Sequence, residues 1–435
     1  MTSISSLYQI YLNHPTICTD TRNITEGSIF FALKGDHFDA NTFTETALQS
    51  GAAYAVIDNA EYQVNDRCIL VPDVLQTLQQ LASHHRSQLN IPVIGLTGTN
   101  GKTTTKELIR AALSGKYKTF ATKGNLNNHI GVPLSILSIT DEIEIAVIEM
   151  GANHQKEIEF LCNIARPTHG LITNVGMAHL EGFGGFEGVK KGKSELYTYL
   201  AQHQGKVFVR SNNPSLLEMS VATALDKDKI VWYGTEPGNF ISGALLKSDP
   251  LLEISWTMQS KTYYTSVNLT GAYNFENVLA AICIAGFFEV GAEQISQGLA
   301  SYMPTNNRSQ IIKTTHNTVI CDFYNANPSS MSAALKNIAL LTAAHKTLII
   351  GDMFELGDES AVQHDLIAEE AAALNADTLI LIGKYFYLLK DKYKGIFFHT
   401  PAEAAEYISA NPVQNNLILL KGSRGMALEQ LLPLL

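Results

Sequence analysis

The sequence is poor in cysteine, and the few cysteines it has are scattered. Its 435 residues contain five, at positions 18, 68, 162, 283 and 321, and none belongs to a Cys-x-x-Cys pair. An odd, widely spaced set argues against a disulfide framework and against a zinc site. We therefore expect small, buried thiol side chains in a reducing compartment.

Long apolar runs and an excess of basic residues are also absent. The longest apolar stretch, residues 278–288, is shorter than the ~20 residues that cross a bilayer, and the first residues lack the pattern of a secretory signal. The 31 basic and 41 acidic residues give a formal charge of −10, which argues against a nucleic-acid or anionic-membrane surface. We expect a cytoplasmic monomer with no membrane span and no nucleic-acid partner.

What the sequence does contain predicts an α/β protein of three units. Its length exceeds one ordinary core, and 46% hydrophobic with 17% charged residues is typical of a globular protein. Strand-like and helical patterns alternate along the chain. They predict a small α/β module at residues 1–88, a central domain with a parallel sheet at 89–304, and a Rossmann-like domain without a dinucleotide fingerprint at 305–435. Residues 206–261 are expected to complete the central sheet, and the C-terminal strands are expected at 319–322, 347–350, 378–381 and 417–420.

Residues 92–105, Pro-Val-Ile-Gly-Leu-Thr-Gly-Thr-Asn-Gly-Lys-Thr-Thr-Thr, are typical of a strand, a phosphate loop and a helix. Glycines allow a tight turn that aims backbone N–H groups at one anion, the lysine adds a mobile charge, and the next hydroxyl can ligate Mg²⁺. Leu96 occupies the first glycine position of the strict motif, so a plain glycine-rich turn is the alternative. The predicted phosphate-binding residues are Gly98, Thr99, Asn100, Gly101, Lys102, Thr103 and Thr104.

Two further strand-like runs carry polar residues at their carboxyl ends. Residues 143–148 lead to Glu149, and residues 170–175 lead to His179. Ligands of open α/β sheets bind at this edge, so the two side chains suit a Mg²⁺ site and its neighbour. The alternatives are a solvated or capping glutamate and a structural histidine.

Three more segments are informative only in combination. Asn274 and Asn277 lie three apart, on one face of a predicted helix, and their amides offer the donor and acceptor that an adenine edge requires. The Asn-rich segment 123–133 could simply form turns. Residues 190–196, Lys-Lys-Gly-Lys-Ser-Glu-Leu, read by chemistry alone as the start of a short basic helix with a solvated face.

Together these motifs resemble those of the Mur ligase family, whose nucleotide loop has the form of residues 97–105 and is shared with folylpolyglutamate synthetases. The resemblance covers nearly the whole chain. Its segments are residues 19–22, 27–35, 149–153, 174–184, 271–277, 322–331, 351–357 with His364, and 420–426.

The resemblance implies a site for ATP and two Mg²⁺ ions. Glu149 and His179 would be metal ligands together with Thr103. Lys193, followed by Glu195, would be carbamylated by CO₂, and the resulting anion would ligate the second Mg²⁺.

It also implies contacts to nucleotide and substrate. Arg308 would reach the ATP phosphates, although an interdomain salt bridge is the alternative, and Asp322 would hold the ribose. Tyr273 stands where the family has histidine, which leaves the neighbouring amides in place. The implied substrate contacts are Thr21 and Arg22 at the uridine end, Asn127 and Asn128 beside the cleft, and Asn325 and Asn327. For Thr21 and Arg22 a plain turn with a carboxylate partner is the alternative.

The segment Tyr-Asn-Ala-Asn-Pro at 324–328 is similar to the branch of the family that adds D-alanyl-D-alanine to UDP-N-acetylmuramoyl-tripeptide. The implied activity is ATP-dependent amide formation through an acyl phosphate, in peptidoglycan precursor synthesis, with Lys102, Lys193, His179 and Arg308 as catalytic residues. Two alternatives remain: a ligase of the folylpolyglutamate synthetase type, and a nucleotide-gated binding protein without ligase activity.

Overall fold

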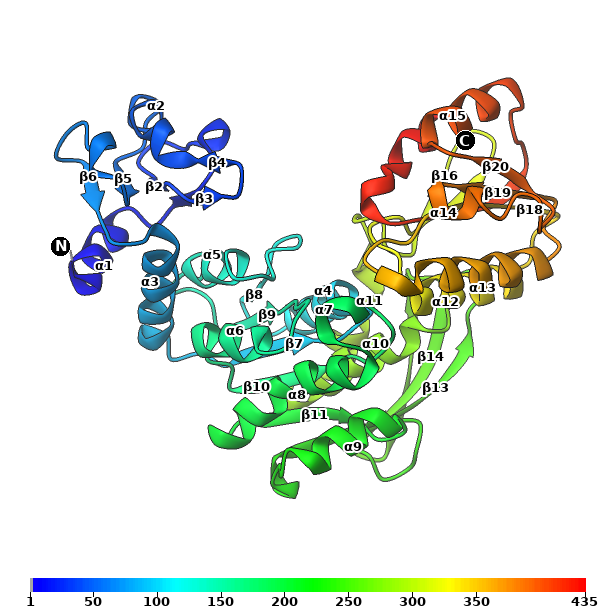
Figure 1. Cartoon of the computed structure of the whole chain (residues 1–435). Helices are drawn as coiled ribbons and strands as arrows, with labels where there is room; N and C mark the ends of the chain where they lie inside the picture. The colour runs from blue at the N-terminus through cyan, green and yellow to red at the C-terminus, as the bar shows by residue number, and fades with distance from the viewer. Residues whose placement is uncertain (1–2) are drawn as a thin grey trace.

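The computed structural model describes residues 3–435 and has three α/β domains, each built on its own sheet. The N-terminal and C-terminal domains lie at opposite ends of the central domain (Figure 1). The predicted α/β fold class is confirmed. The domain boundaries at residues 88 and 304 stay a prediction, but the three main sheets, within residues 17–70, 93–267 and 310–421, agree with them.

The N-terminal domain is a four-stranded parallel sheet in the order β1-β2-β5-β6 with a short hairpin, β3–β4, beside it. Burial of all three β2 side chains fits a strand covered on both faces. The elements are α1 (Ile4–Asn13), β1 (Ile17–Cys18), β2 (Ile29–Phe31), β3 (Lys34–Gly35), β4 (Phe38–Asp39), α2 (Thr44–Gln49), β5 (Tyr54–Ile57), β6 (Cys68–Leu70) and α3 (Val74–Gln88).

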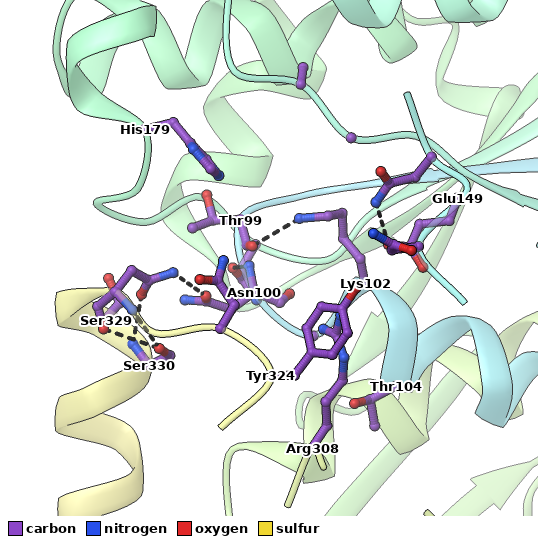
Figure 2. A pocket seen from close by; sticks show the side chains of 18 of the residues that line it. Thr99, Asn100, Lys102, Thr104, Glu149, His179, Arg308, Tyr324, Ser329 and Ser330 are labelled. Carbon is purple, nitrogen blue, oxygen red and sulfur yellow. Dashed lines mark hydrogen bonds between the residues drawn. The ribbon is translucent and has the colours of Figure 1, made fainter. Parts of the chain in front are cut away.

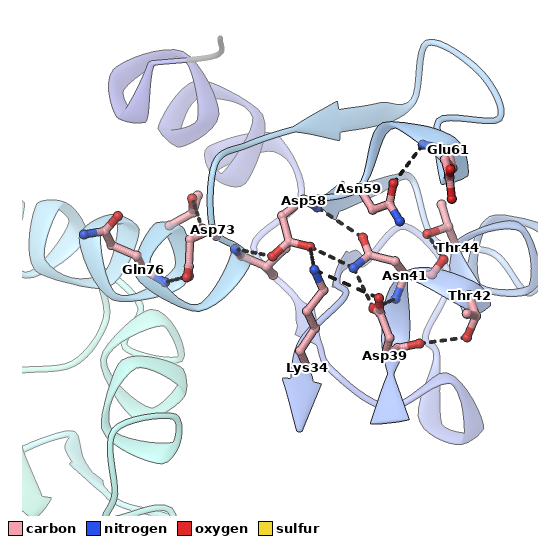
Figure 3. Close-up of polar contacts among 12 residues, drawn as sticks. Lys34, Asp39, Asn41, Thr42, Thr44, Asp58, Asn59, Glu61, Asp73 and Gln76 are labelled. Carbon is pink, nitrogen blue, oxygen red and sulfur yellow. Dashed lines mark hydrogen bonds and ion pairs between the residues drawn. The ribbon is translucent and has the colours of Figure 1, made fainter. Parts of the chain in front are cut away.

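A polar network fixes the β3–β4 hairpin to the rest of this domain (Figure 3). The fully buried Asn41 amide donates to Asp39 and to Asp58, and Lys34 pairs with Asp58 at 2.8 Å. The other oxygen of Asp58 accepts from the backbone N–H of Val74, the first residue of α3. Because α3 packs on the central domain, the hairpin has a defined orientation relative to that domain.

The central domain is a nine-stranded sheet in the order β15-β14-β13-β12-β11-β10-β7-β9-β8. The strands from β8 to β13 pair in parallel, and β14 and β15 add an antiparallel edge, so the prediction that residues 206–261 complete this sheet is confirmed. The strands are β7 (Val93–Thr97), β8 (Thr119–Ala121), β9 (Ile145–Glu149), β10 (His169–Ile172), β11 (Lys206–Arg210), β12 (Ile230–Gly234), β13 (Ile241–Lys247), β14 (Leu252–Met258) and β15 (Lys261–Val267).

Helices cover both faces of the central sheet and form two separate cores. One core takes in α3, α5, α6, α8 and α9 together with α1, and the other takes in α4, α10 and α11. The helices are α4 (Lys102–Leu113), α5 (Gly131–Leu137), α6 (Glu157–Ala165), α7 (Leu180–Phe183), α8 (Phe186–Gln202), α9 (Pro214–Ala222), α10 (Asn274–Phe287) and α11 (Ala292–Ser301). The basic segment 190–196 lies inside α8, so its reading as a helix start is wrong.

The C-terminal domain is a six-stranded sheet in the order β16-β17-β21-β18-β19-β20, in which only β16 is antiparallel to its neighbour. Its strands are β16 (Gln310–Lys313), β17 (Thr318–Cys321), β18 (His345–Gly351), β19 (Thr378–Ile382), β20 (Ile396–Phe398) and β21 (Asn416–Lys421). Its helices are α12 (Pro328–Leu340), α13 (Ser360–Ala373), α14 (Lys384–Tyr387) and α15 (Pro401–Ala410). The four predicted strands are β17, β18, β19 and β21.

All five cysteines are buried and free, as expected. Over residues 3–435, the structure contains no helix that is both long and apolar enough to cross a membrane.

Candidate active site

A cavity of about 840 Å³ lies where the central and C-terminal domains meet, and it collects most of the predicted site residues. Figure 2 shows the side chains of His179, Lys102, Glu149, Arg308 and Tyr324 around it. The predicted residues that line the cavity are Thr99, Asn100, Gly101, Lys102, Thr104, Asn127, Asn128, Glu149, His179, Asn274, Asn277, Arg308, Asp322, Asn325 and Asn327.

The remaining predicted residues lie next to the cavity or far from it. Thr103 contacts Glu149, and Gly98 accepts a hydrogen bond from Lys102, so both belong to its floor. Lys193 lies behind the wall, where its Nζ is 3.3 Å from the carbonyl oxygen of Ala152. Thr21 and Arg22, in the N-terminal domain, do not line the cavity.

The phosphate loop follows β7 and ends in α4, as predicted. Gly98 and Gly101 have φ values of +141° and +77°, a region that L side chains rarely adopt. A Cβ on Gly101 would lie 2.7 Å from Oδ1 of Asn277. Among the described residues no side chain caps α4, so its first backbone N–H groups and the positive end of its dipole face the cavity as an anion site.

The loop is also bonded to the tip of β10. Asn174 accepts from the backbone N–H of Asn100 through its side chain and from that of Thr99 through its carbonyl oxygen. The hydroxyl of Thr99 accepts in turn from the N–H of Gly176 at 2.9 Å. The segment that leads to His179 and the loop that leads to Lys102 are therefore one unit.

Lys102 lies across its own loop. Its Nζ donates to the carbonyl oxygens of Gly98 and Thr99 at 2.8 and 3.0 Å. Burial lowers the pKa of Lys102 to about 8, an effect that the charge of Glu149 opposes and that of Arg308 increases. An anion at the helix terminus would offset both neighbouring positive charges.

Glu149 provides the best fit to a divalent cation. Its side chain is 1% exposed, Oε1 accepts from Thr103 and Asn127 at 3.2 and 2.9 Å, and Oε2 has no hydrogen-bond partner within residues 3–435. A buried carboxylate oxygen without a partner is costly unless a cation compensates it. Glu149 and the Thr103 hydroxyl are the hard oxygen ligands that Mg²⁺ takes beside phosphate. The part of the chain that the structure describes holds no cluster of three His, Cys, Asp or Glu side chains suited to a metal, so any site must include ligands of other kinds.

Lys106 was not predicted and lies directly behind this carboxylate. Its side chain is fully buried, donates to the carbonyl oxygens of Thr122 and Gly124, and is 3.9 Å from Oε2 of Glu149. From the sequence it is one more charged residue in a helix, and only its position one turn after Lys102 sets it apart. It connects α4 to the strand tips that carry Glu149 and the Asn-rich loop.

His179 lines the cavity, whereas Lys193 lies behind its wall. Burial lowers the pKa of His179, and the charges of Lys102 and Lys193 add to this effect, while Glu355, whose Oε2 lies 2.6 Å from Nδ1, opposes it. Lys193 is 2% exposed and lies over the ring of Phe183. Burial and the charge of Lys102 lower its pKa to about 7.

Glu195, which follows Lys193 in the motif, lies outside the cavity and has a supporting position. Its carboxylate accepts from the backbone N–H groups of Lys156 and Glu159 at 2.6 and 3.0 Å. It therefore caps the start of α6. Because Lys156 lines the cavity, Glu195 connects the helix of Lys193 to the cavity wall.

The predicted adenine-binding amides are partly used within the protein. Asn277 donates to Oδ1 of Asn274, and Asn274 donates to the carbonyl oxygen of Thr270. Asn274 has few free groups left, whereas Oδ1 of Asn277 remains available beside the phosphate loop. The hydroxyl of Tyr273 bonds to that of Ser309 at 2.7 Å, so this side chain joins the central domain to the first residues of the C-terminal domain.

Residues of the C-terminal domain form the opposite wall. Asp322 accepts from Lys421 at 2.6 Å and from the backbone of Ser309. The Arg308 guanidinium stacks on the ring of Tyr324, 3.8 Å from its centre, and Nε has no hydrogen-bond partner in the described chain. The salt bridge considered for Arg308 is not formed, because no carboxylate within residues 3–435 pairs with it.

Within each of the pairs Asn127–Asn128 and Asn325–Asn327, the two side chains have different partners. Asn127 bonds Glu149, whereas Asn128 accepts from the backbone of Ile130 and Gly131 and so forms a turn. Asn327 caps α12 and donates to Oδ1 of Asn100 at 2.8 Å, across the two domains. Within the described chain, the side chain of Asn325 accepts only from the next backbone N–H.

Thr21 and Arg22 adopt the arrangement of a simple turn. Asp20 caps the turn at 21–23 and pairs with Arg22 at 2.6 Å, and the Arg22 side chain is 86% exposed. The pairing lowers the pKa of Asp20 to about 2. A role for Arg22 at the uridine end stays a prediction.

Comparisons with known proteins agree with this geometry. Residues 96–285 match the Mur ligase middle domain, and residues 307–424 match the Mur ligase glutamate ligase domain. The UDP-N-acetylmuramoyl-tripeptide–D-alanyl-D-alanine ligase of Bacillus subtilis is 32% identical over 95% of this chain and 92% of its own length.

Solved structures give the same assignment. The MurF structure from Acinetobacter baumannii has a TM-score of 0.86 and 32% identity, covering 96% of this chain and 92% of its own. The MurF ligase of Thermotoga maritima, solved in complex with ADP, has a TM-score of 0.84 and 25% identity, with 97% of each chain covered. A folylpolyglutamate synthase of Mycobacterium tuberculosis, at 14% identity and a TM-score of 0.65 over 83% of this chain and 93% of its own, shares the fold alone. The chain therefore belongs to the Mur ligase family, among the UDP-N-acetylmuramoyl-tripeptide–D-alanyl-D-alanine ligases.

Proposed function

We propose that this protein joins the amino group of D-alanyl-D-alanine to the terminal carboxylate of UDP-N-acetylmuramoyl-tripeptide, with hydrolysis of ATP to ADP and phosphate, in peptidoglycan precursor synthesis. One observation carries the proposal beyond family membership. The phosphate loop, Glu149 and the Tyr324–Asn327 segment that is typical of this branch line a single cavity.

Activation of the carboxylate is the first chemical task, because a carboxylate is a poor electrophile. Its oxygen attacks the γ-phosphorus of ATP, a C–O–P linkage forms and ADP leaves. Lys102 and Arg308 line the cavity from opposite domains, and their charges offset the negative charge on the transferring phosphoryl group.

Amide formation follows. The free amine of D-alanyl-D-alanine attacks the carbonyl carbon of the acyl phosphate, the C–N bond forms, phosphate leaves and the amine gives up a proton. The acyl phosphate must be kept from water during this step. The contact between Asn327 and Asn100 supports a closed arrangement in which both domains cover it.

Thr103 and Glu149 would hold a Mg²⁺ ion beside the outer phosphates. When bound, this ion supplies a positive charge that stabilises the transferring phosphoryl group and the leaving ADP. Oε2 of Glu149 accepts no hydrogen bond within residues 3–435, which supports this assignment, and Asn127 orients the carboxylate from the side.

Lys193 is suited to carbamylation, in which its neutral amine forms a C–N bond with CO₂ and releases one proton. The side chain is buried, and its ammonium group has only the Ala152 carbonyl oxygen as an acceptor within the described residues. The carbamate anion would, with His179, hold a second Mg²⁺, whose charge would stabilise the carboxylate as it attacks. The pKa of about 7 leaves much of the amine neutral at physiological pH.

The proposed site is complete within one chain, which supports a monomer as the active unit. Its substrates, ATP and a UDP-linked precursor, support a cytoplasmic location.

A phosphate-release assay tests the proposal. Purified protein should release phosphate from ATP and Mg²⁺ only when both UDP-N-acetylmuramoyl-tripeptide and D-alanyl-D-alanine are present, and mass spectrometry should detect the pentapeptide product. Parallel reactions with a diaminopimelate-containing and a lysine-containing tripeptide identify the accepted substrate. No phosphate release with either tripeptide would refute the proposal, and glutamate addition to folate would support the folylpolyglutamate synthetase alternative.

A further inference from the structure

Glu355 joins the C-terminal domain to His179, and the mechanism above gives it no role. Its Oε2 lies 2.6 Å from Nδ1 of His179. Glu355 belongs to the loop after β18, whereas His179 precedes α7 in the central domain. The contact therefore exists only while the two domains are docked.

Both residues hold an unfavourable backbone conformation. The φ values are +53° for His179 and +63° for Glu355, in the left-handed region that non-glycine residues rarely adopt. Strained residues persist where the surrounding structure determines their conformation, and they concentrate at functional sites. Because both residues of this contact are strained, we infer that the surrounding structure fixes the contact in place.

The loop that carries Glu355 is held on both sides. His364 accepts from the backbone N–H of Met353, and the hydroxyl of Ser423 accepts from that of Phe354, each at 2.9 Å. At the far end of the loop, a Cβ on Gly357 would lie 3.2 Å from Oε2 of Glu181, in α7. Three motifs of the C-terminal domain, at 351–357, His364 and 420–426, thus form one support for Glu355.

The contact with the Glu355 carboxylate places a proton on Nδ1 of the His179 ring. A neutral imidazole that donates from Nδ1 to a carboxylate has its lone pair on Nε2. Figure 2 shows the ring of His179 directed toward Thr99 and the phosphate loop. Metal-binding histidines are commonly oriented by such a carboxylate on the other ring nitrogen.

We propose that Glu355 is a positioning residue that presents Nε2 of His179 to the second Mg²⁺ site, and that it does so only when the C-terminal domain is docked. The inference rests on the proposed function. It makes completion of the metal site depend on domain closure, so that the carboxylate is activated only in a cavity from which water is excluded.

Metal binding to the ADP complex tests this role without relying on turnover. Mn²⁺, which replaces Mg²⁺ and is observable by electron paramagnetic resonance, is titrated into wild-type protein, Glu355→Ala, Glu355→Gln and Asp358→Ala. Asp358 is the matched control, since it is an exposed carboxylate only three residues away. Glu355→Ala should weaken the second Mn²⁺ by about 10–100-fold and lower kcat, with the KM for ATP unchanged. Asp358→Ala should match the wild type.

The outcomes separate positioning from a simple interdomain tie. A tie would lower the thermal unfolding temperature of Glu355→Ala but leave Mn²⁺ affinity at the wild-type value, and that result would overturn the proposal. Glu355→Gln keeps an acceptor for Nδ1–H, so it should lose less affinity than Glu355→Ala, and equal losses would also count against an orienting role. Circular dichroism verifies that each variant is folded.

Failure of this inference is distinguishable from failure of the proposed function. If wild-type protein shows no phosphate release with both substrates, the proposed ligase activity fails. If the wild type is active and Glu355→Ala equals it in metal affinity and kcat, only the role of Glu355 is refuted.

Discussion

The phosphate loop and the Thr21–Arg22 turn both resemble motifs of the Mur ligase family, yet their contacts in the structure are very different. The loop is hydrogen-bonded to Asn174 after β10 and to Asn327 at the start of α12, and Gly101 packs closely against Asn277 of α10. Within residues 3–435, the Arg22 side chain of the turn pairs only with the nearby Asp20. A motif becomes a site where distant parts of the chain fix its atoms, and substitutions in the two regions should differ accordingly.

Of the substitutions in the two regions, Lys102→Ala should have the largest effect on kcat. Loss of the one loop side chain that carries a positive charge should lower kcat at least ~10²-fold, the scale of removing one preorganised charge donor. Phosphate release with both substrates measures it. Lys118→Ala, in the same domain but 65% exposed, is the control, and near-normal turnover in Lys102→Ala would mean that the loop is not catalytic.

Lys193→Ala should have the second-largest effect on kcat. Removal of a metal-ligating anion should lower kcat by about 10–100-fold, and added formate or acetate should restore part of the activity by occupying the vacated space. Lack of rescue, combined with an unmodified Lys193 in the intact mass of the wild type measured in bicarbonate buffer, would argue against carbamylation.

The pH dependence of stability sharpens the account of Lys193. Its pKa falls from 10.5 to about 7 on folding, so between pH 7 and 10.5 the unfolded chain holds more protons at this group. In CO₂-free buffer, the contribution of Lys193 therefore makes the free energy of unfolding increase as pH rises through that window. Thermal unfolding should show Lys193→Met more stable than the wild type at pH 7, with a smaller difference at pH 9. A constant difference would mean that the folded-state pKa is not lowered.

Arg22→Ala should have the smallest effect. If Arg22 contacts the UDP-linked substrate, the KM for that substrate should rise, at most about fivefold for one exposed charge, with kcat unchanged. Asp20→Ala is the informative partner, since it frees the guanidinium and should not raise KM. If both variants match the wild type, the Thr21–Arg22 turn is structural and, unlike the phosphate loop, does not contribute to activity.

Local pattern was sufficient to predict much of this molecule. The strand, loop and helix around residues 93–113 and the four inner C-terminal strands follow from apolar runs and glycine placement, because buried parallel strands leave a continuous signal. The edge strands β16 and β20 were missed. They have three or four residues each and no fully buried side chain, so their pattern carries little information.

Residues whose role depends on distant partners could not be predicted in this way. Lys106 and Glu355 look like ordinary surface charges, and only the folded chain shows one fully buried behind Glu149 and the other against His179. The segment 190–196 was misread for a related reason. Burial of Lys193 inside α8 depends on α6 and α7 packing over it, which no local pattern encodes.

Asn327 joins the two domains through a neutral amide. It terminates a helix in one domain and reaches the nucleotide loop of another. A neutral hydrogen bond of this type contributes only about 1 kcal/mol, so this contact can break each time the domains separate to release ADP. The His179–Glu355 pair and the Asn337–Thr270 hydrogen bond must break in the same step.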